Sequence, residues 1–352
     1  MKRLVLIPII VFLTSCQLFL SPDPDNNPTG IFNAIWNDFN ETYPLFDHKG
    51  IDWDEQYRIF SPQIRQDMSD SELFWVISNM LWELNDRHVS LISPLWWFNS
   101  GCNDFGDGDR FSAYLFREYY LENSNLTDGG ILYGTFRNNS NIGYIHIESF
   151  SGTAVLKVDD WAREIGDIVN SLKNTDALVL DIRNNGGGSP LNLEYIARHF
   201  LSKQSNAGRS RTKNGHGRND FTDWTTWTLS PVDGSYVKPI ALLTNRHSVS
   251  ASESFTVAMK TQDHVIHIGR PTGGAVSAII LRYLINGWLY TISIQDTTDM
   301  DGNRYEAKGL SDYGGIYPDF YIDNYDRDWS LWSVTDSQAD FAIDYLLEKL
   351  AN

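Results

Sequence analysis

The chain has 352 residues, of which 42% are hydrophobic, so it can form one large domain or two and bury a sizeable core. Its formal net charge of −17 argues against nucleic acid as a partner, because phosphate contacts require clustered Lys and Arg. The same charge argues against electrostatic docking on an anionic lipid surface.

The N-terminal residues are predicted to lie outside the fold. Lys2 and Arg3 form a basic start, and residues 4–13 form an apolar run that is too short to span a bilayer. The following Leu-Thr-Ser-Cys resembles a bacterial lipoprotein lipobox. This resemblance implies a signal peptide at 1–15, lipidation of Cys16 and a membrane anchor in the bacterial cell envelope, on the periplasmic or surface face of the outer membrane. The alternative is an ordinary signal peptide that is cut without lipidation. Residues 16–29 are rich in Pro, Asp and Asn and are predicted to be a tether.

Cys102 is the second of the two cysteines, so lipidation of Cys16 would leave no intramolecular disulfide. The sequence around it, SGCNDFGDGD, contains Asp-Gly-Asp but lacks a twelve-residue calcium loop that ends in Glu. We therefore expect a solvated loop there, and the sequence predicts neither a metal site nor a cofactor.

Residues 30–93 are predicted to form a helical lobe. Apolar residues recur at helical spacing, and Asp70 or Ser71 is a plausible N-cap of the last helix. The lobe ends in LNDRHVSL, which places His88 where a helix gives way to an extended run. Residues 94–140 are predicted to be an irregular connection with a strand-like run at 111–118.

Residues 141–352 are predicted to form an α/β core, because strands and helices alternate from 142 to 269. The predicted strands are 142–150, 177–182, 240–244 and 264–269, and the predicted helices are 155–172, 191–201, the run after Ser250 and 337–350. The polar segment 203–227 is expected to be a loop, hairpin or flap. A β-hairpin is predicted over 279–294, with its turn at Asn286-Gly287.

Two predicted strand-to-helix turns could support chemistry. The first contains Gly186, Gly187 and Gly188, which would allow backbone N–H groups to approach a ligand closely and could form an oxyanion hole. The second contains Ser250, and a hydroxyl at such a turn can be exposed as a nucleophile. Both turns also have simpler interpretations, as a glycine-rich turn and as the capping box Ser250-Ala-Ser-Glu253.

A serine nucleophile needs a base, and the chain has eight histidines. His247 lies in the Ser250 turn itself, whereas His264 and His267 lie on a predicted strand and do not point the same way. His88 is the best placed long-range partner because it sits at the boundary of a lobe. Sequence position alone leaves the choice between these histidines open.

Three motifs, LNDRHVSL, ALVLDIRNNGGGSP and TNRHSVSASESFTVAM, occur in the order typical of the tricorn and C-terminal-processing serine peptidase family, and the chain resembles that family from about residue 30 to 349. The resemblance implies a crotonase/ClpP-like β/α core behind the helical lobe. It also implies a serine endopeptidase that acts on peptides or unfolded proteins through an acyl-enzyme on Ser250, with His88 as base. Gly186 or Gly187, together with Ala251, would supply the oxyanion N–H groups.

The chain departs from the C-terminal-processing branch, where a lysine 25 residues after the serine is the base, because Ala275 occupies that position. Lys260 lies about 15 Å from Ser250 along the predicted helix, and Lys308 is remote in sequence. The tricorn-like branch is therefore implied, with Glu306 as the preferred acidic member and Asp312 as the runner-up. Arg87 stands where the best-known tricorn arrangement has a serine, and the stretch between Leu91 and Ile142 is too short for the PDZ domain that many relatives carry.

Two other functions remain open at this level. One is a non-proteolytic lipoprotein that binds an apolar ligand on the same fold. Aromatic residues that could contact such a ligand, but could equally belong to a core, are Trp96, Trp97, Phe98, Trp224 and Trp227. The other is a surface lipoprotein whose site has decayed.

Overall fold

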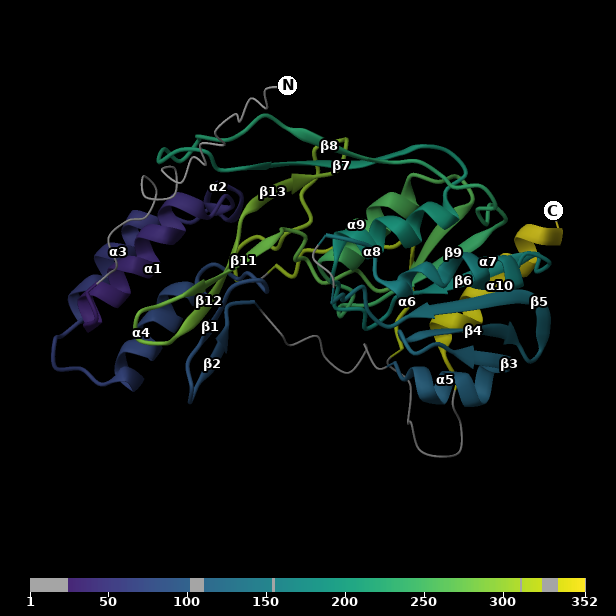
Figure 1. The fold of residues 1–352 in the computed structure, drawn as a ribbon, viewed down its shortest axis with the longest axis horizontal. Helices are drawn as coiled ribbons and strands as arrows, with labels where there is room; N and C mark the ends of the chain where they lie inside the picture. The colour runs from purple at the N-terminus through teal and green to yellow at the C-terminus, as the bar shows by residue number, and fades with distance from the viewer. Residues whose placement is uncertain (1–24, 102–110, 154–155, 311, 325–334, 352) are drawn as a thin grey trace, which may run out of the picture.

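The computed structural model describes residues 25–101, 111–153, 156–310, 312–324 and 335–351, which form an N-terminal lobe and an α/β core (Figure 1). The predicted signal peptide, Cys16, Cys102 and most of the Gly/Asp-rich loop lie outside the described residues. No helix in the described ranges is long and apolar enough to cross a membrane.

The N-terminal lobe combines helices with a sheet. Its helices are α1 (Pro28–Thr42), α2 (Phe46–Lys49), α3 (Trp53–Phe60) and α4 (Asp70–Trp82), with a 3₁₀ turn at Ser61–Gln63. Asn27 caps α1, and its Oδ1 accepts the Gly30 N–H at 2.9 Å. Ser69 and Glu72 form a capping box at the start of α4, so the N-cap lies one residue before the earliest predicted position.

An antiparallel sheet packs against these helices in the order β11-β12-β1-β2. Its strands are β1 (Ser90–Ile92), β2 (Trp97–Asn99), β11 (Ile279–Tyr283) and β12 (Leu289–Ser293). The predicted hairpin at 279–294 therefore exists but belongs to the N-terminal lobe, although the sequence placed it within a core of residues 141–352. The lobe consequently contains both the segment that follows His88 and a segment from far along the chain.

The core is a seven-stranded sheet in the order β14-β10-β9-β6-β5-β4-β3. Its parallel strands are β5 (Asn139–Ile147), β6 (Ala177–Asp181), β9 (Ile240–Thr244), β10 (Val265–Gly269) and β14 (Phe320–Tyr321), and β3 (Leu121–Leu126) and β4 (Ile131–Phe136) add an antiparallel edge. The strands β6 and β9 are buried along their whole length, as expected for central strands covered on both faces.

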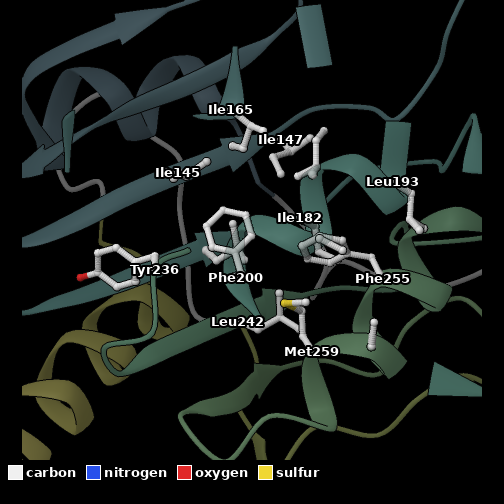
Figure 2. Close-up of a cluster of buried hydrophobic side chains, with 14 of the residues drawn as sticks. Ile145, Ile147, Ile165, Ile182, Leu193, Phe200, Tyr236, Leu242, Phe255 and Met259 are labelled. Atoms are coloured by element: carbon white, nitrogen blue, oxygen red, sulfur yellow. The ribbon is translucent and has the colours of Figure 1, made fainter. Parts of the chain in front are cut away.

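Helices cover both faces of this sheet. One face carries α6 (Asp160–Arg163), α7 (Ile165–Ser171), α8 (Pro190–Ala197), the 3₁₀ turn Arg198–Phe200 and α9 (Ala251–Lys260). Figure 2 shows side chains of this layer, among them Ile165, Leu193, Phe255 and Met259, packed on strand residues such as Ile145 and Leu242. The other face carries α5 (Ala113–Tyr120) and α10 (Ser337–Ala351). The predicted α/β fold class is therefore confirmed.

The described residues between 94 and 140 form more helix and strand than the sequence predicts. The run 111–118, predicted as a strand, is largely the helix α5, whose Ser112 side chain caps the Leu115 N–H at 3.4 Å. The strands β3 and β4 follow and join the main sheet. The short apolar runs in this segment fit a helix or a strand equally well, and tertiary packing decides between them.

The polar segment after residue 203 forms a long hairpin of β7 (Ser205–Thr212) and β8 (Thr225–Leu229), and β13 (Gln295–Thr298) pairs with β7. Figure 1 shows this hairpin reaching from the core across to the N-terminal helices. Near its tip His216 Nδ1 lies 3.1 Å from Glu41 Oε1 and Arg218 lies 3.4 Å from Asp54. The hairpin therefore contacts both parts of the molecule.

Candidate active site

Ser250 lies at the turn between β9 and α9, in the backbone conformation of a strained elbow. Its φ of +60° and ψ of −121° are unfavourable for a residue with a Cβ. The turn is braced from within, since Ser248 Oγ donates to the Ile182 carbonyl at 2.8 Å. Strain of this kind persists only when neighbouring contacts fix it, and for Ser250 those contacts come from Glu253.

Glu253 is fully buried beneath the turn, and its carboxylate accepts four hydrogen bonds. Oε1 accepts from Thr272 Oγ1 at 2.7 Å and from the Gly274 N–H at 2.8 Å. Oε2 accepts from the Ala275 N–H at 2.8 Å and from the Ser250 N–H at 3.1 Å. Burial raises the pKa of Glu253, while the hydrogen bonds from Thr272, Ala275, Gly274 and Ser250 oppose that shift. The predicted capping-box glutamate thus joins the nucleophile turn to residues 272–275.

The glycine-rich turn after β6 lies directly against Ser250. The Asn185 carbonyl accepts the Val249 N–H at 3.1 Å and Ser252 Oγ at 2.8 Å, which joins the two turns. Gly187 has a φ of +91°, and a Cβ there would lie 2.7 Å from the Ser250 Cβ. Glycine is therefore required at 187 both for its backbone angle and for this close approach.

The candidate oxyanion donors are not equivalent. The Gly187 N–H already donates to Asn185 Oδ1 at 2.9 Å. Gly186 is exposed, and among the described residues its N–H has no recorded acceptor. Ala251 is the first residue of α9, so its N–H has no acceptor within the helix. Of these candidates, the N–H groups of Gly186 and Ala251 are therefore the ones without an acceptor among the described residues.

His88 lies between α4 and β1, held through its backbone. Its N–H donates to Asp86 Oδ1 at 2.8 Å, and its carbonyl accepts Thr291 Oγ1 at 2.6 Å. The ring Nδ1 is buried and has no hydrogen-bond partner among the described residues. Burial lowers the pKa of His88, whereas Asp86 and the backbone of Ser277 raise it. The net lowering favours a neutral ring, which can accept a proton.

Glu306 is buried close to the same backbone segment. Its Oε1 accepts the N–H groups of Val276 at 2.8 Å and Ser277 at 2.7 Å. Its Oε2 is buried without a hydrogen-bond partner among the described residues, and no hydrogen bond to His88 is recorded. Burial and the neighbouring Asp86 raise the pKa of Glu306 to about 8.

Residues 272–277 bring these groups together. Glu253 holds one end of the segment and Glu306 holds the other, while the Ala275 carbonyl accepts the Ser250 N–H at 3.0 Å. The backbone of Ser277 contacts His88. One short segment therefore links Ser250, His88 and Glu306, which are far apart in the sequence.

Sequence reasoning missed Asp86 as a central group. It is fully buried, and Tyr43 and Ser293 donate to its Oδ2 at 2.8 and 2.9 Å. Its place two residues before His88 was the available signal. Arg87, whose role the sequence left open, extends Nη1 to the Arg246 carbonyl at 2.8 Å and so ties the histidine segment to the nucleophile turn.

The alternative catalytic groups have other roles. Ala275 is buried, and Lys260 pairs with Asp319 at 2.6 Å. Asp312 accepts the N–H groups of Lys308 at 2.7 Å and Gly314 at 3.0 Å, so it caps its own turn. His267 is buried against Thr244 Oγ1 at 2.6 Å, and burial lowers its pKa to about 3. Within the described ranges no cluster of His, Cys, Asp and Glu could hold a metal ion.

A cavity of about 310 Å³ adjoins the nucleophile turn. Ala251 and Val276 form part of its wall next to Ser250, and Leu193, Val257 and Trp227 add apolar surface. Trp227 is oriented by a hydrogen bond from its Nε1 to Glu194 Oε1 at 2.8 Å. The cavity can accept an apolar group next to the serine.

Replacing Glu253 by Gln should destabilise the protein by roughly 2 to 4 kcal/mol, because an amide NH₂ would face backbone N–H groups that then lose their buried acceptor. Urea unfolding measures this loss. Glu72→Gln is the matched control, since Glu72 occupies the same capping-box position with an exposed side chain and its replacement should change little. Equal unfolding midpoints for Glu253→Gln and the wild type would contradict this account of the turn.

Replacing Glu306 by Gln should stabilise the protein at alkaline pH. The folded pKa near 8 exceeds the ordinary value of 4.5, so the folded state binds more protons in that window and wild-type stability falls as pH rises through it. Gln keeps an oxygen acceptor for Val276 and Ser277 but cannot ionise. We expect the thermal midpoint of Glu306→Gln to exceed that of the wild type at pH 8.5, with a smaller difference at pH 5. A difference in thermal midpoint that does not depend on pH would show that ionisation of Glu306 does not cause the loss of wild-type stability at alkaline pH.

Comparison with known proteins finds two matching family models. The model of peptidase family S41 matches residues 141–322, and the tricorn protease C1 domain matches residues 24–82. The carboxy-terminal processing protease CtpB of Bacillus subtilis is 25% identical over 181 residues, which are 51% of this chain and 35% of that protein. The tricorn protease of Thermoplasma acidophilum is 27% identical over 253 residues, which are 71% of this chain and 20% of that protein.

A solved structure of a candidate peptidase from Parabacteroides merdae has a TM-score of 0.79 and 29% identity, and the match covers 92% of this chain and 98% of that one. The matched regions span only about a third or less of the length of the curated relatives. The family model nevertheless matches more than half of the present sequence, and the chain therefore belongs to peptidase family S41.

Proposed function

We propose that the protein is a serine endopeptidase that uses Ser250 as nucleophile and His88 as base. The observation that carries the proposal is the segment 272–277, which contacts the Ser250 turn, His88 and Glu306 through its backbone. Without this segment the two proposed catalytic groups would belong to separate parts of the fold.

In the proposed reaction Ser250 Oγ attacks the carbonyl carbon of a peptide bond while His88 accepts the hydroxyl proton. The negative charge that develops on the carbonyl oxygen is stabilised by the N–H groups of Gly186 and Ala251. His88 then donates its proton to the departing amine, which leaves an acyl-enzyme on Ser250. Water, deprotonated by His88, hydrolyses that ester and restores the hydroxyl.

Glu306 would act once it is ionised. Its unpaired Oε2 and the unpaired Nδ1 of His88 are both buried beside the same backbone segment. A carboxylate there stabilises the imidazolium that forms when His88 accepts a proton. Glu306 is in this proposal a positioning and electrostatic residue, which fits its lack of a direct hydrogen bond to the ring.

The substrate is proposed to be a peptide or an unfolded protein, with an apolar side chain in the cavity beside Ala251. The lipobox-like sequence supports the further proposal that Cys16 anchors the protein to a membrane of the bacterial cell envelope. The tether at 16–29 would then hold the peptidase close to that membrane. The alternative, a non-proteolytic binder of an apolar ligand, is favoured only by the apolar wall of the same cavity.

A fluorophosphonate probe tests the function. Ser250→Ala should abolish labelling, and His88→Ala should slow it by about 10²–10⁴-fold through loss of the base. Cleavage of an unfolded protein such as denatured casein should fall in parallel. His247→Ala is the matched histidine control, since His247 is exposed in the same turn, and it should be labelled like the wild type.

Labelling that persists in Ser250→Ala would remove the proposed nucleophile, and normal labelling of His88→Ala would remove the proposed base. An unlabelled wild type that binds an apolar ligand tightly would instead favour the binding function.

A further inference from the structure

Lys49 is a buried lysine whose ammonium group forms no ion pair with a carboxylate among the described residues. Its side chain is only 6% exposed. Nζ donates to the Asn85 carbonyl at 3.2 Å and to the Ala307 carbonyl at 2.9 Å. A lysine is rarely buried so deeply, because desolvating the ammonium is costly. Its placement therefore requires a compensating interaction.

The two carbonyls identify that interaction. Asn85 directly precedes Asp86, and Ala307 directly follows Glu306. Both of these carboxyl groups are buried, with exposures of 0% and 3%. The Lys49 side chain, from α2, therefore connects the backbone next to Asp86 with the backbone next to Glu306. Asp86 accepts the His88 N–H, and Glu306 accepts the N–H groups of Val276 and Ser277.

The charge of Lys49 also connects it with the two buried carboxyl groups. Asp86 and Glu306 bring two carboxyl groups into a region of low dielectric constant, where like charges repel strongly. Lys49 supplies a positive charge to both His88 and Glu306: it lowers the pKa of Glu306, against burial and Asp86, and it lowers the pKa of His88. Both effects keep Glu306 ionised and His88 neutral over a wider pH range.

We propose that Lys49 is a positioning residue of the peptidase site, which joins the Asp86–His88 segment to the Glu306 segment and supplies the positive charge that the two buried carboxyl groups require. The inference rests on the proposed function of Ser250 and His88. Lys49 touches neither substrate nor reacting atoms in this role.

Other charged groups face the same region. Asp86 and Glu253 act on Glu306, and Asp86 and Arg87 act on His88. His48 contacts the Glu306 carbonyl at 3.0 Å, and burial lowers its pKa, with Lys49, Arg304 and Lys308 adding to that lowering. The test must therefore change the charge at position 49 alone and compare it with a lysine of similar bonding elsewhere.

The variants are Lys49→Met, Lys49→Arg and Lys238→Met. Lys238 is the matched control, since its Nζ also donates to two backbone carbonyls, those of Lys173 at 3.0 Å and Thr175 at 2.6 Å, away from the site. The rate of Ser250 labelling by a fluorophosphonate is measured from pH 5 to pH 10. In the wild type the rate should rise as Glu306 ionises near its raised pKa of about 8.

Lys49→Met should move this rise upward by about one pH unit or more, because the carboxylate loses its nearby positive charge. The rate at pH 7 should then fall about ten-fold. Lys49→Arg should keep the wild-type midpoint even where its maximal rate is lower, and Lys238→Met should keep both. The role of Lys49 is overturned if Lys49→Met keeps the wild-type midpoint of the pH–rate profile. It is also overturned if Lys49→Arg shifts that midpoint as far as Lys49→Met does. A wild type that is not labelled on Ser250 would overturn the proposed function and this role together.

A stability measurement keeps the inference testable when Lys49→Met folds poorly. Thermal unfolding at pH 9 compares the wild type, Lys49→Met, Glu306→Gln and the double variant. Glu306→Gln should stabilise the Lys49→Met protein more than it stabilises the wild type, because the buried carboxylate has then lost its counter-charge. Additive effects, or a double variant no more stable than Lys49→Met, would contradict the proposed charge balance.

Discussion

The site depends on one buried carboxylate, that of Glu253. It accepts hydrogen bonds from Ser250, Thr272, Gly274 and Ala275, and so fixes a strained serine and a distant loop relative to each other. These hydrogen bonds stabilise the fold because each buried N–H group has a carboxyl oxygen as its acceptor, whereas a buried N–H group without an acceptor would cost about 1–3 kcal/mol. A glutamate that looks like an ordinary helix cap is therefore the group that shapes the nucleophile turn.

Glu306 repeats this arrangement at the other end of residues 272–277, with an important difference. Glu253 uses both oxygens, whereas Glu306 leaves Oε2 unpaired in a buried place close to Asp86. Glu253 thus has a structural role, whereas Glu306 has one oxygen free to interact electrostatically with a neighbouring charge. Lys49 and Arg87 add links from the N-terminal lobe, to the Glu306 segment and to the Ser250 turn respectively, so the two parts of the molecule meet at the site.

Much of this organisation could be predicted from the sequence. The alternation after residue 142 predicts the positions of the buried strands along the chain, and the turns at Gly186–Gly188 and Ser250 can be predicted because glycine runs and small polar residues follow strands there. The helix α5 was mistaken for a strand, since its eight residues are too few for periodicity to distinguish the two. The hairpin β11–β12 was recognised but assigned to the core, because a local pattern says nothing about which distant sheet a strand joins.

Asp86 and Lys49 were missed for the same reason. Their importance arises from burial and from partners more than thirty residues away, which the neighbouring residues do not specify. The one local signal is the place of Asp86 two residues before His88.

In the proposed site Ser250, held by Glu253, faces two backbone N–H groups and the ring of His88. A crystal structure of the protein after reaction with a peptidyl phosphonate tests it most directly. We expect a covalent bond from phosphorus to Ser250 Oγ, a phosphoryl oxygen within hydrogen-bond distance of the Gly186 and Ala251 N–H groups, and the His88 ring beside Oγ. An adduct on another side chain, or a phosphoryl oxygen turned away from both N–H groups with His88 out of reach, would contradict it.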